Sequence, residues 1–439
     1  MSAACAPVVP HRCLPNHPVP DGFDEVVHAA PFGRMHTLNS SLRSISPEAT
    51  LALARPLAER LGISRVTDTT RLDRIGIPVF ASVRPAAVAG SLCVNAGKGI
   101  RVIEAQVGAY MEAIEFAIAE QPGPHHDVRA VDPRQLLGGC QSVDAIADLC
   151  PSRRKGVDFT APLECVDAED IVHHTNVLVP AELVFVPYVP RTGAALFGSS
   201  TNGLASGNTI AEATLHGLLE VIERDVKSFN HVRHNAKRVA ADSLPNGARE
   251  LLSMIESAGL FLCVRAMPNG FKIPMFEAHL YDPAAVGPIA VMGGYGCHVV
   301  PEIALTRAIT EAVQSRLTTI HGGRDDLIRF AVRTSIGGPG DLERRAAVGF
   351  RTLMESPDVI DFDEVEVGVR EPANIDDAIE RTIERLLECG VERVCRVVLT
   401  EPHEALHVVR VIVPKLEFFN RDLPRMGPRL LGYMHDRVA

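Results

Sequence analysis

The chain has 439 residues, which is enough for two domains or for one large elaborated domain. Hydrophobic residues make up 46% of it and charged residues 22%, as in a globular protein with a large core. The formal net charge of −10 argues against nucleic-acid binding, because no basic surplus is available to neutralise phosphates. No apolar run is long enough for a membrane-spanning helix, so a membrane partner is not expected either.

Residues 1–32 contain scattered proline and histidine without a helical period, and we expect an irregular N-terminal extension there. The same residues lack the charged start and apolar stretch of a signal peptide, so a cytoplasmic location is expected. The ten cysteines form no C-x-x-C pair and match no zinc-finger spacing. Free thiols are therefore favoured over a structural metal site.

The first predicted helix spans residues 46–62. Ser46 is a good N-cap, Pro47 occupies the first helical position and Gly62 ends the pattern. The segment 72–85 then predicts a turn followed by a strand.

A second helix is predicted over 101–120, before a region of different composition. Residues 121–195 are rich in proline and glycine and hold a basic cluster at 153–155. We interpret this region as a variable excursion with one or two strands, including one over 183–189. Residues 201–209 are interpreted as a turn-rich loop.

The rest of the chain alternates helices and strands. A long helix is expected over 209–229, a strand–loop–strand region over 261–298, another helix over 302–320, and a helix with strands over 375–414. The predicted fold class is therefore α/β in the mixed (α+β) sense, with mixed sheets and long acidic helices.

The long helix carries an acidic stripe. At about 100° per residue, Glu212, His216, Glu220 and Glu223 fall within a sector of about 80°. Leucines flank this stripe, so it borders the buried side of the helix. A buried acidic stripe is costly unless it binds a metal or a cationic ligand. The alternative is a solvated helix face with Arg224 as a partial counter-ion.

Two further patterns strengthen a functional interpretation. Glu112 and Glu115 are spaced i, i+3 among apolar neighbours on the second helix, and with the acidic stripe they offer five carboxylates, enough for one or two Mg²⁺ ions. On the helix over 302–320, Arg307, Glu311 and Gln314 share a face. Arginine at the rim of a carboxylate–metal cluster is a natural phosphate contact, although Arg307 and Glu311 could also form a simple i, i+4 ion pair.

Several common nucleotide and nucleophile motifs are absent from the sequence. The segment Gly97–Gly99 does not complete a P-loop, and there is no dinucleotide fingerprint and no nucleophile elbow. Phosphates would therefore be held by carboxylate-bound Mg²⁺ and by arginines.

These segments, in this order, resemble the YcaO family. The matching stretches are LDRIGIPVFASVRP, GKG with the E-x-x-E of the second helix, STNGLASGNT, EATLHGLLEVIERD, GYGCH, ALTRAITEAVQSR and GGRDD. The similarity spans roughly residues 33–420, which we expect to form the catalytic domain, and it leaves 421–439 as a C-terminal tail.

The resemblance implies an enzyme that binds ATP and Mg²⁺ and phosphorylates a backbone amide oxygen of a peptide. The metal ligands that it implies are Glu112, Glu115, Glu212, Glu220 and Glu223. The nucleotide contacts that it implies are Asn208, Arg224, Glu311, Gln314 and Arg316, with Lys98 and Arg43 as weaker candidates. Gly108 and Phe116 depart from the family's usual Ser and Arg or Tyr, which affects one nucleotide contact and leaves the carboxylates intact.

The family has several branches, which differ in the nucleophile that attacks the activated amide. A Cys, Ser or Thr side chain gives an azoline, external sulfide gives a thioamide and an amine gives an amidine. The tail 421–439 lacks the proline-rich end that is typical of azoline-forming members. The phrases SPEATL, LDRIGIPV and SSTNGLASGNT look closest to members that work with a TfuA-type partner and install thioamides, which is the function we expect.

Alternatives remain open at this point. They are a cyclodehydratase with a separate leader-binding partner, an accessory factor in ribosomal-protein methylthiolation, and a non-catalytic scaffold. Cys297 could relay sulfur, but a packed core thiol is favoured, and His216 could act as a base, but a hydrogen bond to a neighbouring carboxylate is favoured. The resemblance also makes a homodimer an expectation.

Overall fold

A computed structural model describes residues 36–38, 40–138, 144–152, 160–193, 195–324, 341–419 and 425–436, together with Asp158 and Leu327. Four features singled out in the sequence lie wholly or partly outside these residues: the extension over 1–32, the basic cluster at 153–155, the end of the GGRDD motif at 325–326, and parts of the tail 421–439.

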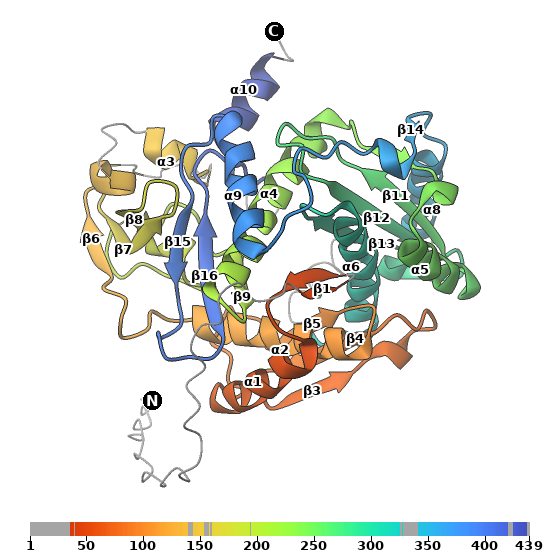
Figure 1. The fold of residues 1–439 in the computed structure, drawn as a ribbon, viewed down its shortest axis with the longest axis horizontal. Helices are drawn as coiled ribbons and strands as arrows, with labels where there is room; N and C mark the ends of the chain where they lie inside the picture. Colours follow the sequence, from red (N-terminus) through yellow and green to blue (C-terminus); the bar gives the residue numbers. More distant parts are fainter. Residues whose placement is uncertain are drawn as a thin grey trace, which may run out of the picture. The chain divides into compact units, whose positions relative to one another are not determined.

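Four β-sheets organise the described residues (Figure 1). The first is a hairpin of β1 (His36–Leu38) and β2 (Ser41–Arg43). A three-stranded antiparallel sheet has the order β3 (Arg65–Asp68), β4 (Val79–Val83) and β5 (Val94–Lys98). A five-stranded sheet has the order β13 (Val291–Cys297), β12 (Met275–Tyr281), β11 (Phe261–Ala266), β10 (Lys237–Val239) and β14 (Val359–Ile360).

The largest sheet joins strands from distant parts of the chain. Its order is β6 (Arg129–Val131), β7 (Leu163–Asp170), β15 (Cys395–Val398), β16 (His407–Ile412) and β9 (Leu204–Gly207), and β8 (Thr175–Pro180) pairs with β7. The region 121–195 therefore supplies three strands to this sheet. The predicted strand over 183–189 is wrong, because Val184 and Phe185 are buried without strand pairing. A short apolar run does not distinguish a strand from a buried loop.

The helices predicted from periodicity and caps are confirmed, with bounds that differ by a few residues. They are α1 (Pro47–Arg60), α2 (Val102–Ala119), α4 (Ile210–Arg233), α6 (Pro301–His321) and α9 (Ile375–Glu388). The Ser46 side chain accepts a hydrogen bond from the Ala49 N–H at 3.3 Å, as its N-cap position predicts. Thr209 caps α4 in the same way, accepting from the Glu212 N–H at 3.1 Å.

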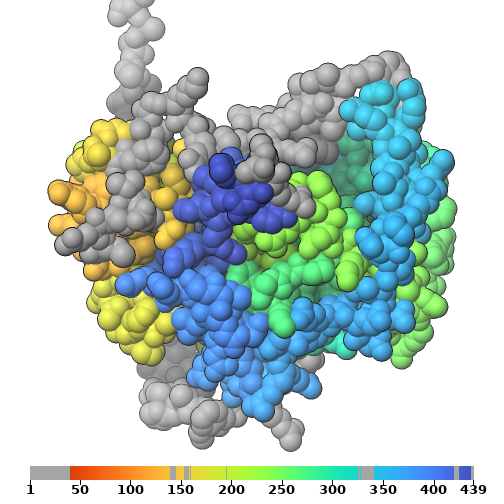
Figure 2. All heavy atoms as spheres, turned by 90° about the horizontal axis from the view of Figure 1, so that it is seen from above, coloured from red at the N-terminus to blue at the C-terminus, as the bar shows by residue number. Residues whose placement is uncertain are grey.

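The remaining helices are α3 (Asp144–Asp148), α5 (Asn246–Ser257), α8 (Asp341–Met354) and α10 (Pro428–Asp436), of which α10 lies within the predicted C-terminal tail. Seen from above, the dark blue C-terminal residues lie between the orange and yellow residues on one side and the green residues on the other (Figure 2). No helix in the described part of the chain is long and apolar enough to cross a membrane.

Helix α4 runs through the middle of the molecule (Figure 1). It contacts β9 and β16 of the largest sheet on one side and β13 of the five-stranded sheet on another. Leu218 and Ile222 on its apolar side are fully buried. The stripe that carries Glu212 and Glu223 therefore lies on a helix that is packed between two sheets, and the fold class is mixed α/β as predicted.

Glycines in two strands allow helices to approach the sheets closely. A Cβ atom on Gly97 of β5 would lie 2.0 Å from the backbone nitrogen of Ala109 in α2. A Cβ atom on Gly296 of β13 would lie 2.1 Å from the carbonyl oxygen of Ala304 in α6. Only glycine fits at such contacts, so these two motif residues set the positions of α2 and α6.

The region 201–209, interpreted as a turn-rich loop, includes strand β9. Ser206 pairs with Val408 and Leu204 with Arg410 in an antiparallel register with β16. Gly203 before it has a φ of +78° and supplies the turn. Pairing with a strand two hundred residues away cannot be read from the local composition, and this explains the error.

Candidate functional site

A cavity of about 870 Å³ opens among α2, α4, α6, β5 and the segment around β2. This volume is within the range of small-molecule sites. The predicted site residues that line it are Arg43, Lys98, Glu112, Glu115, Asn208, Glu212, Glu220, Glu223, Arg224, Glu311 and Gln314. Residues from five separate elements are thus brought together at one cavity.

Arg316 is the one predicted site residue that the structure does not bring to this cavity. Its guanidinium is buried and donates at 2.8 Å to Asp73, to Asp282 and to the carbonyl of Ile289. Two residues along a helix correspond to a rotation of about 200°, so Arg316 points away from the face that Gln314 presents. Its predicted nucleotide contact is therefore corrected to a structural role between α6 and the neighbouring loops.

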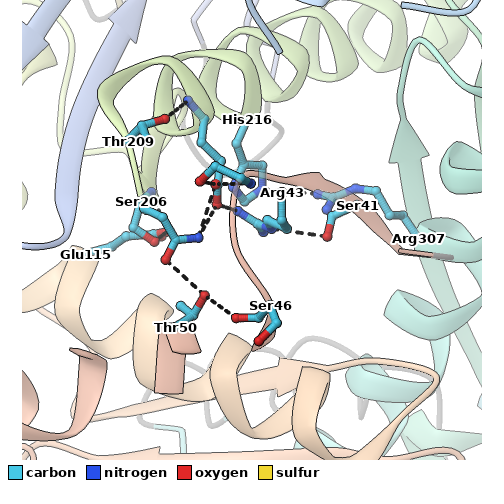
Figure 3. A network of polar contacts seen from close by, with 12 residues as sticks. Ser41, Arg43, Ser46, Thr50, Glu115, Ser206, Thr209, His216 and Arg307 are labelled. Carbon is cyan, nitrogen blue, oxygen red and sulfur yellow. Dashed lines mark hydrogen bonds and ion pairs between the residues drawn. The ribbon is translucent and has the colours of Figure 1, made fainter. Parts of the chain in front are cut away.

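Glu212 begins the acidic stripe, and its carboxylate is already surrounded by protein donors. Arg43 Nη1 lies 2.7 Å from Oε1, and the Ser44 N–H and hydroxyl lie 3.0 Å and 2.9 Å from Oε2. The Asn208 amide also donates to both oxygens. Burial alone would raise the pKa of Glu212, but Arg43 and the Ser44 N–H outweigh it and lower this pKa. Glu212 therefore anchors the segment of β2 to α4, and Figure 3 shows Arg43 and Ser41 within this network.

Glu112 and Glu115 on α2 are held by uncharged groups. Glu112 accepts from the Ala96 N–H at 3.2 Å, and Glu115 accepts from the Ser206 N–H at 2.8 Å and from its hydroxyl at 2.6 Å (Figure 3). Burial raises the pKa of Glu112, and it raises the pKa of Glu115 to about 8. Neither carboxylate forms an ion pair with another residue of the described chain. Both are thus desolvated, and for Glu112 the charges of Arg324 and Lys98 only partly offset the effect of burial.

The C-terminal end of the stripe is only loosely neutralised. Arg224 lies 3.6 Å from Glu220 and 3.7 Å from Glu223, which is too long for a direct hydrogen bond. Burial raises the pKa of Glu223 despite the nearby Arg224, and the charge of Glu311 acts in the same direction. This end therefore concentrates negative charge in the cavity.

The α6 wall adds polar groups that hold β5. Lys98 donates to Glu311 at 2.8 Å, and Gln314 donates to the carbonyl of Ala96 at 2.6 Å. Burial would raise the pKa of Glu311, but Lys98 and the nearby arginines lower it to about 2, so this carboxylate is charged. The contacts fix β5 against α6 along the cavity.

Arg307 is a functional candidate that the list of implied site residues missed. Its Nη2 lies 3.2 Å from His216 Nε2, and it forms no ion pair with a carboxylate of the described residues. Arginine can only donate, so His216 Nε2 accepts; burial and the charge of Arg307 lower the pKa of His216 well below its usual value. His216 is therefore a neutral acceptor, which corrects the expected hydrogen bond to a carboxylate. The signal for Arg307 was its shared helix face with Glu311 and Gln314.

Cys297 does not reach the cavity. It is 2% exposed on β13 and packs in the core with Met275 and Val299. Burial raises the pKa of its thiol well above the usual value. The expectation of a packed core thiol is confirmed, and a sulfur relay has no geometric support.

The two departures from the family pattern both line the cavity, about two turns apart on α2. A Cβ atom on Gly108 would lie 3.3 Å from the Gly97 Cα, so a larger residue there would push α2 away from β5. Phe116 is 8% exposed and its ring centroid lies 5.9 Å from the Arg84 guanidinium carbon. This wall is therefore tighter and more apolar than the family pattern implies.

The residue set fits Mg²⁺ and a nucleotide. No cluster of three acidic, His or Cys side chains within the described ranges is close enough to be a preformed metal site. Even so, one cavity collects four carboxylates that form no ion pair shorter than 3.6 Å with the described residues: Glu112, Glu115, Glu220 and Glu223. Carboxylate oxygens are the ligands that Mg²⁺ prefers, and a divalent cation would relieve the desolvation that raises the pKa values of Glu112, Glu115 and Glu223. Arg224, and Arg307, which pairs with no described carboxylate, add phosphate-binding capacity.

Comparisons with known proteins agree with this site. An uncharacterized protein of Methanothermobacter thermautotrophicus is 36% identical over 391 residues, which cover 88% of this chain and 98% of the relative. A Rhizobium leguminosarum bv. trifolii protein, named for its position in the tfuA 3′ region, is 34% identical over 395 residues, covering 85% of this chain and 88% of the relative. Both similarities extend over most of each chain, so the whole fold is shared.

A solved structure shows the same relationship. YcaO from Methanopyrus kandleri bound with AMPPCP and Mg²⁺ superimposes with a TM-score of 0.67 at 25% identity, covering 89% of this chain and 96% of that one. The family model described as YcaO cyclodehydratase, ATP- and Mg²⁺-binding, matches residues 96–417. This match spans more than half of the chain and contains α2, α4 and α6, so the chain belongs to the YcaO family of ATP- and Mg²⁺-binding enzymes.

Proposed function

We propose that this chain uses ATP and Mg²⁺ to activate a backbone amide of a peptide or protein, and that sulfide then converts the amide to a thioamide. The observation that carries the proposal is the cavity with four carboxylates, Glu112, Glu115, Glu220 and Glu223, which form no ion pair shorter than 3.6 Å with the described residues. Such a site is unstable by itself and suits a metal-bound nucleotide.

The side chains around the cavity would have two roles, metal binding and phosphate binding. Glu112, Glu115, Glu220 and Glu223 would hold the metal, and Arg307 and Arg224 would contact phosphate oxygens. Bound ATP and Mg²⁺ supply a phosphoryl group that makes the amide oxygen a good leaving group, so that hydrosulfide, ATP and the amide give the thioamide, ADP and phosphate.

The second group of residues keeps these side chains in place. Arg43 and Asn208 hold Glu212 and thereby close one end of the cavity. Lys98 and Gln314 hold β5 against α6 along its length. Of the implied ligands, Glu212 would need to exchange protein donors for a metal, so we assign it the anchoring role first.

The sulfide branch rests on the relative whose name places it in the tfuA 3′ region. By this likeness, a TfuA-type protein is the proposed partner, and a peptide or protein is the proposed substrate. The catalytic domain over 33–420, the homodimer and the cytoplasmic location stay predictions.

An azoline-forming cyclodehydratase is the competing function, because a heterocyclase in complex with substrate and cofactor shares the fold, with a TM-score of 0.65 at 19% identity. The test is to co-express the chain with a TfuA-type protein and a candidate peptide, and to measure the mass of the peptide by mass spectrometry. Replacement of oxygen by sulfur raises the mass, whereas azoline formation removes water and lowers it. A mass decrease would overturn the sulfide branch, and an unchanged mass with no ATP consumption would overturn amide activation.

A further inference from the structure

A fully buried arginine lies directly behind the acidic cavity. Arg410 on β16 is 0% exposed. Its Nε donates to the carbonyl of Val184 at 3.0 Å, Nη1 to the carbonyl of Asn202 at 2.9 Å and Nη2 to the carbonyl of Ser200 at 2.8 Å. It forms no ion pair with a carboxylate within the described ranges. A buried charge held only by carbonyl groups is costly, so this residue calls for a specific explanation.

The three carbonyls show what Arg410 holds. Ser200 and Asn202 belong to the irregular segment 196–203, which leads into β9, and Thr201 between them lines the cavity. The planar guanidinium donates along fixed directions, so it sets the path of this backbone more strictly than a lysine could.

An anion holds the other end of the same segment. The Glu182 carboxylate accepts from the N–H groups of Leu196, Phe197 and Gly198 at 2.7, 2.9 and 2.5 Å. One buried anion therefore binds three N–H groups of segment 196–203, and one buried cation binds two of its carbonyl oxygens. An irregular segment that lacks regular strand pairing is thereby kept in one conformation.

The segment ends at a partner of the predicted metal ligands. Three residues after its end, the Ser206 N–H and hydroxyl both donate to the same oxygen of Glu115. This arrangement leaves the second oxygen of Glu115 without a hydrogen-bond donor among the described residues, and Glu115 lines the cavity. Such outer contacts orient metal ligands and tune their affinity.

The charges around Arg410 also connect this residue to the cavity. Burial lowers its pKa to about 9, and the negative charges of Glu220 and Glu115 act against that decrease. The guanidinium thus lies close enough to the cavity to be stabilised by two of the proposed metal ligands, from the side that no ligand can reach.

We propose that Arg410 is a positioning residue for the metal–nucleotide site, acting through segment 196–203 and Ser206 on the Glu115 carboxylate. The inference rests on the proposed function, because it takes Glu115 as a metal ligand. It adds a residue that touches neither substrate nor cofactor and that lies almost three hundred residues from Glu115 along the chain.

The test measures Mg²⁺-dependent binding of AMPPCP by calorimetry, using the full chain. Arg410→Lys retains the charge but cannot reach all three carbonyls, and it is expected to raise the half-saturating Mg²⁺ concentration about tenfold, as loss of outer contacts to metal ligands does. Ser206→Ala, which removes one hydroxyl, is expected to have a similar effect in a well-folded protein. Because both act on Glu115, the double variant should show clearly less than the product of the two effects.

Arg316→Lys is the matched control, since Arg316 is also buried but lies outside the cavity. It is expected to lower thermal stability without changing the Mg²⁺ dependence. Independent, multiplicative effects of Arg410→Lys and Ser206→Ala would overturn the proposal, as would unchanged Mg²⁺ dependence in either single variant. Glu220→Gln separates the two levels: if it also binds normally, the cavity is not the Mg²⁺ site and the proposed function fails, whereas a loss of binding there alone rejects only the role of Arg410.

Discussion

The two ends of the acidic stripe on α4 carry the same residue type in opposite states. At the N-terminal end, five donor contacts surround the Glu212 carboxylate and its pKa is lowered. At the C-terminal end, Glu223 has Arg224 at 3.7 Å and its pKa is raised by burial. Identical side chains on one helix face thus lie in different environments: protein donors hold the closely paired end, and the loosely paired end concentrates carboxylates in the cavity.

The largest effect on nucleotide binding is expected at the loosely paired C-terminal end of the acidic stripe. Replacing Glu223 by glutamine should weaken Mg²⁺-dependent AMPPCP binding by about 100-fold, because a proposed ligand loses its charge. The melting temperature should stay equal or rise, since a desolvated charge is removed. Calorimetry and thermal unfolding of the same sample check both statements. A clear decrease in melting temperature would contradict the view that this carboxylate is uncompensated in the free protein.

At the closely paired N-terminal end of the stripe, a loss of stability is expected. The Glu212→Gln variant should lose about 2 kcal/mol of unfolding free energy, because Arg43 and the Ser44 donors lose a charged acceptor. Urea denaturation measures this loss, and Arg43→Gln serves in a double-mutant cycle. If the cycle gives no coupling between the two residues, the anchoring role of Glu212 is wrong.

Arg307, which contacts His216 in the middle of the stripe, is expected to show a smaller effect. Replacing Arg307 by glutamine should raise the dissociation constant of AMPPCP about tenfold and leave Mg²⁺ binding in the absence of nucleotide unchanged, because a phosphate contact is lost and no carboxylate is altered. Equilibrium binding with and without nucleotide distinguishes these effects. A parallel loss of metal binding would instead assign Arg307 to the charge balance of the cavity.

The smallest effect is expected on the facing wall. Gly108→Ser restores the side chain that the family pattern usually has, but its Cβ would lie 3.3 Å from the Gly97 Cα. We expect a loss of less than about 1 kcal/mol of unfolding free energy, with nucleotide affinity changed only a few-fold. Denaturation together with AMPPCP titration measures both, and a larger loss would mean that α2 cannot move away from β5.

Local signals predicted most of the helices and most of the site. Ser46 and Pro47 begin α1 through contacts within one turn, and the i, i+3 and i, i+4 spacings of the acidic residues are already present in the linear chain. Because a helix converts spacing directly into a shared face, the grouping of Glu112 with Glu115 and of Glu220 with Glu223 could be predicted. The family resemblance, not helix spacing, suggested Arg316 as a nucleotide contact, but it is two residues beyond Gln314 and faces the other way.

Only the tertiary structure decided which of these carboxylates are paired. Glu212 is neutralised by Arg43 and Ser44, which lie about 170 residues away along the chain, and Glu115 is oriented by Ser206. Strand β9 and the buried Arg410 likewise depend on pairing between distant segments. The sequence by itself determined the mixed α/β class, the acidic helices and the set of candidate oxygen ligands. Their charge states required the fold, because desolvation and ion pairing depend on neighbours in space and not on spacing along the chain.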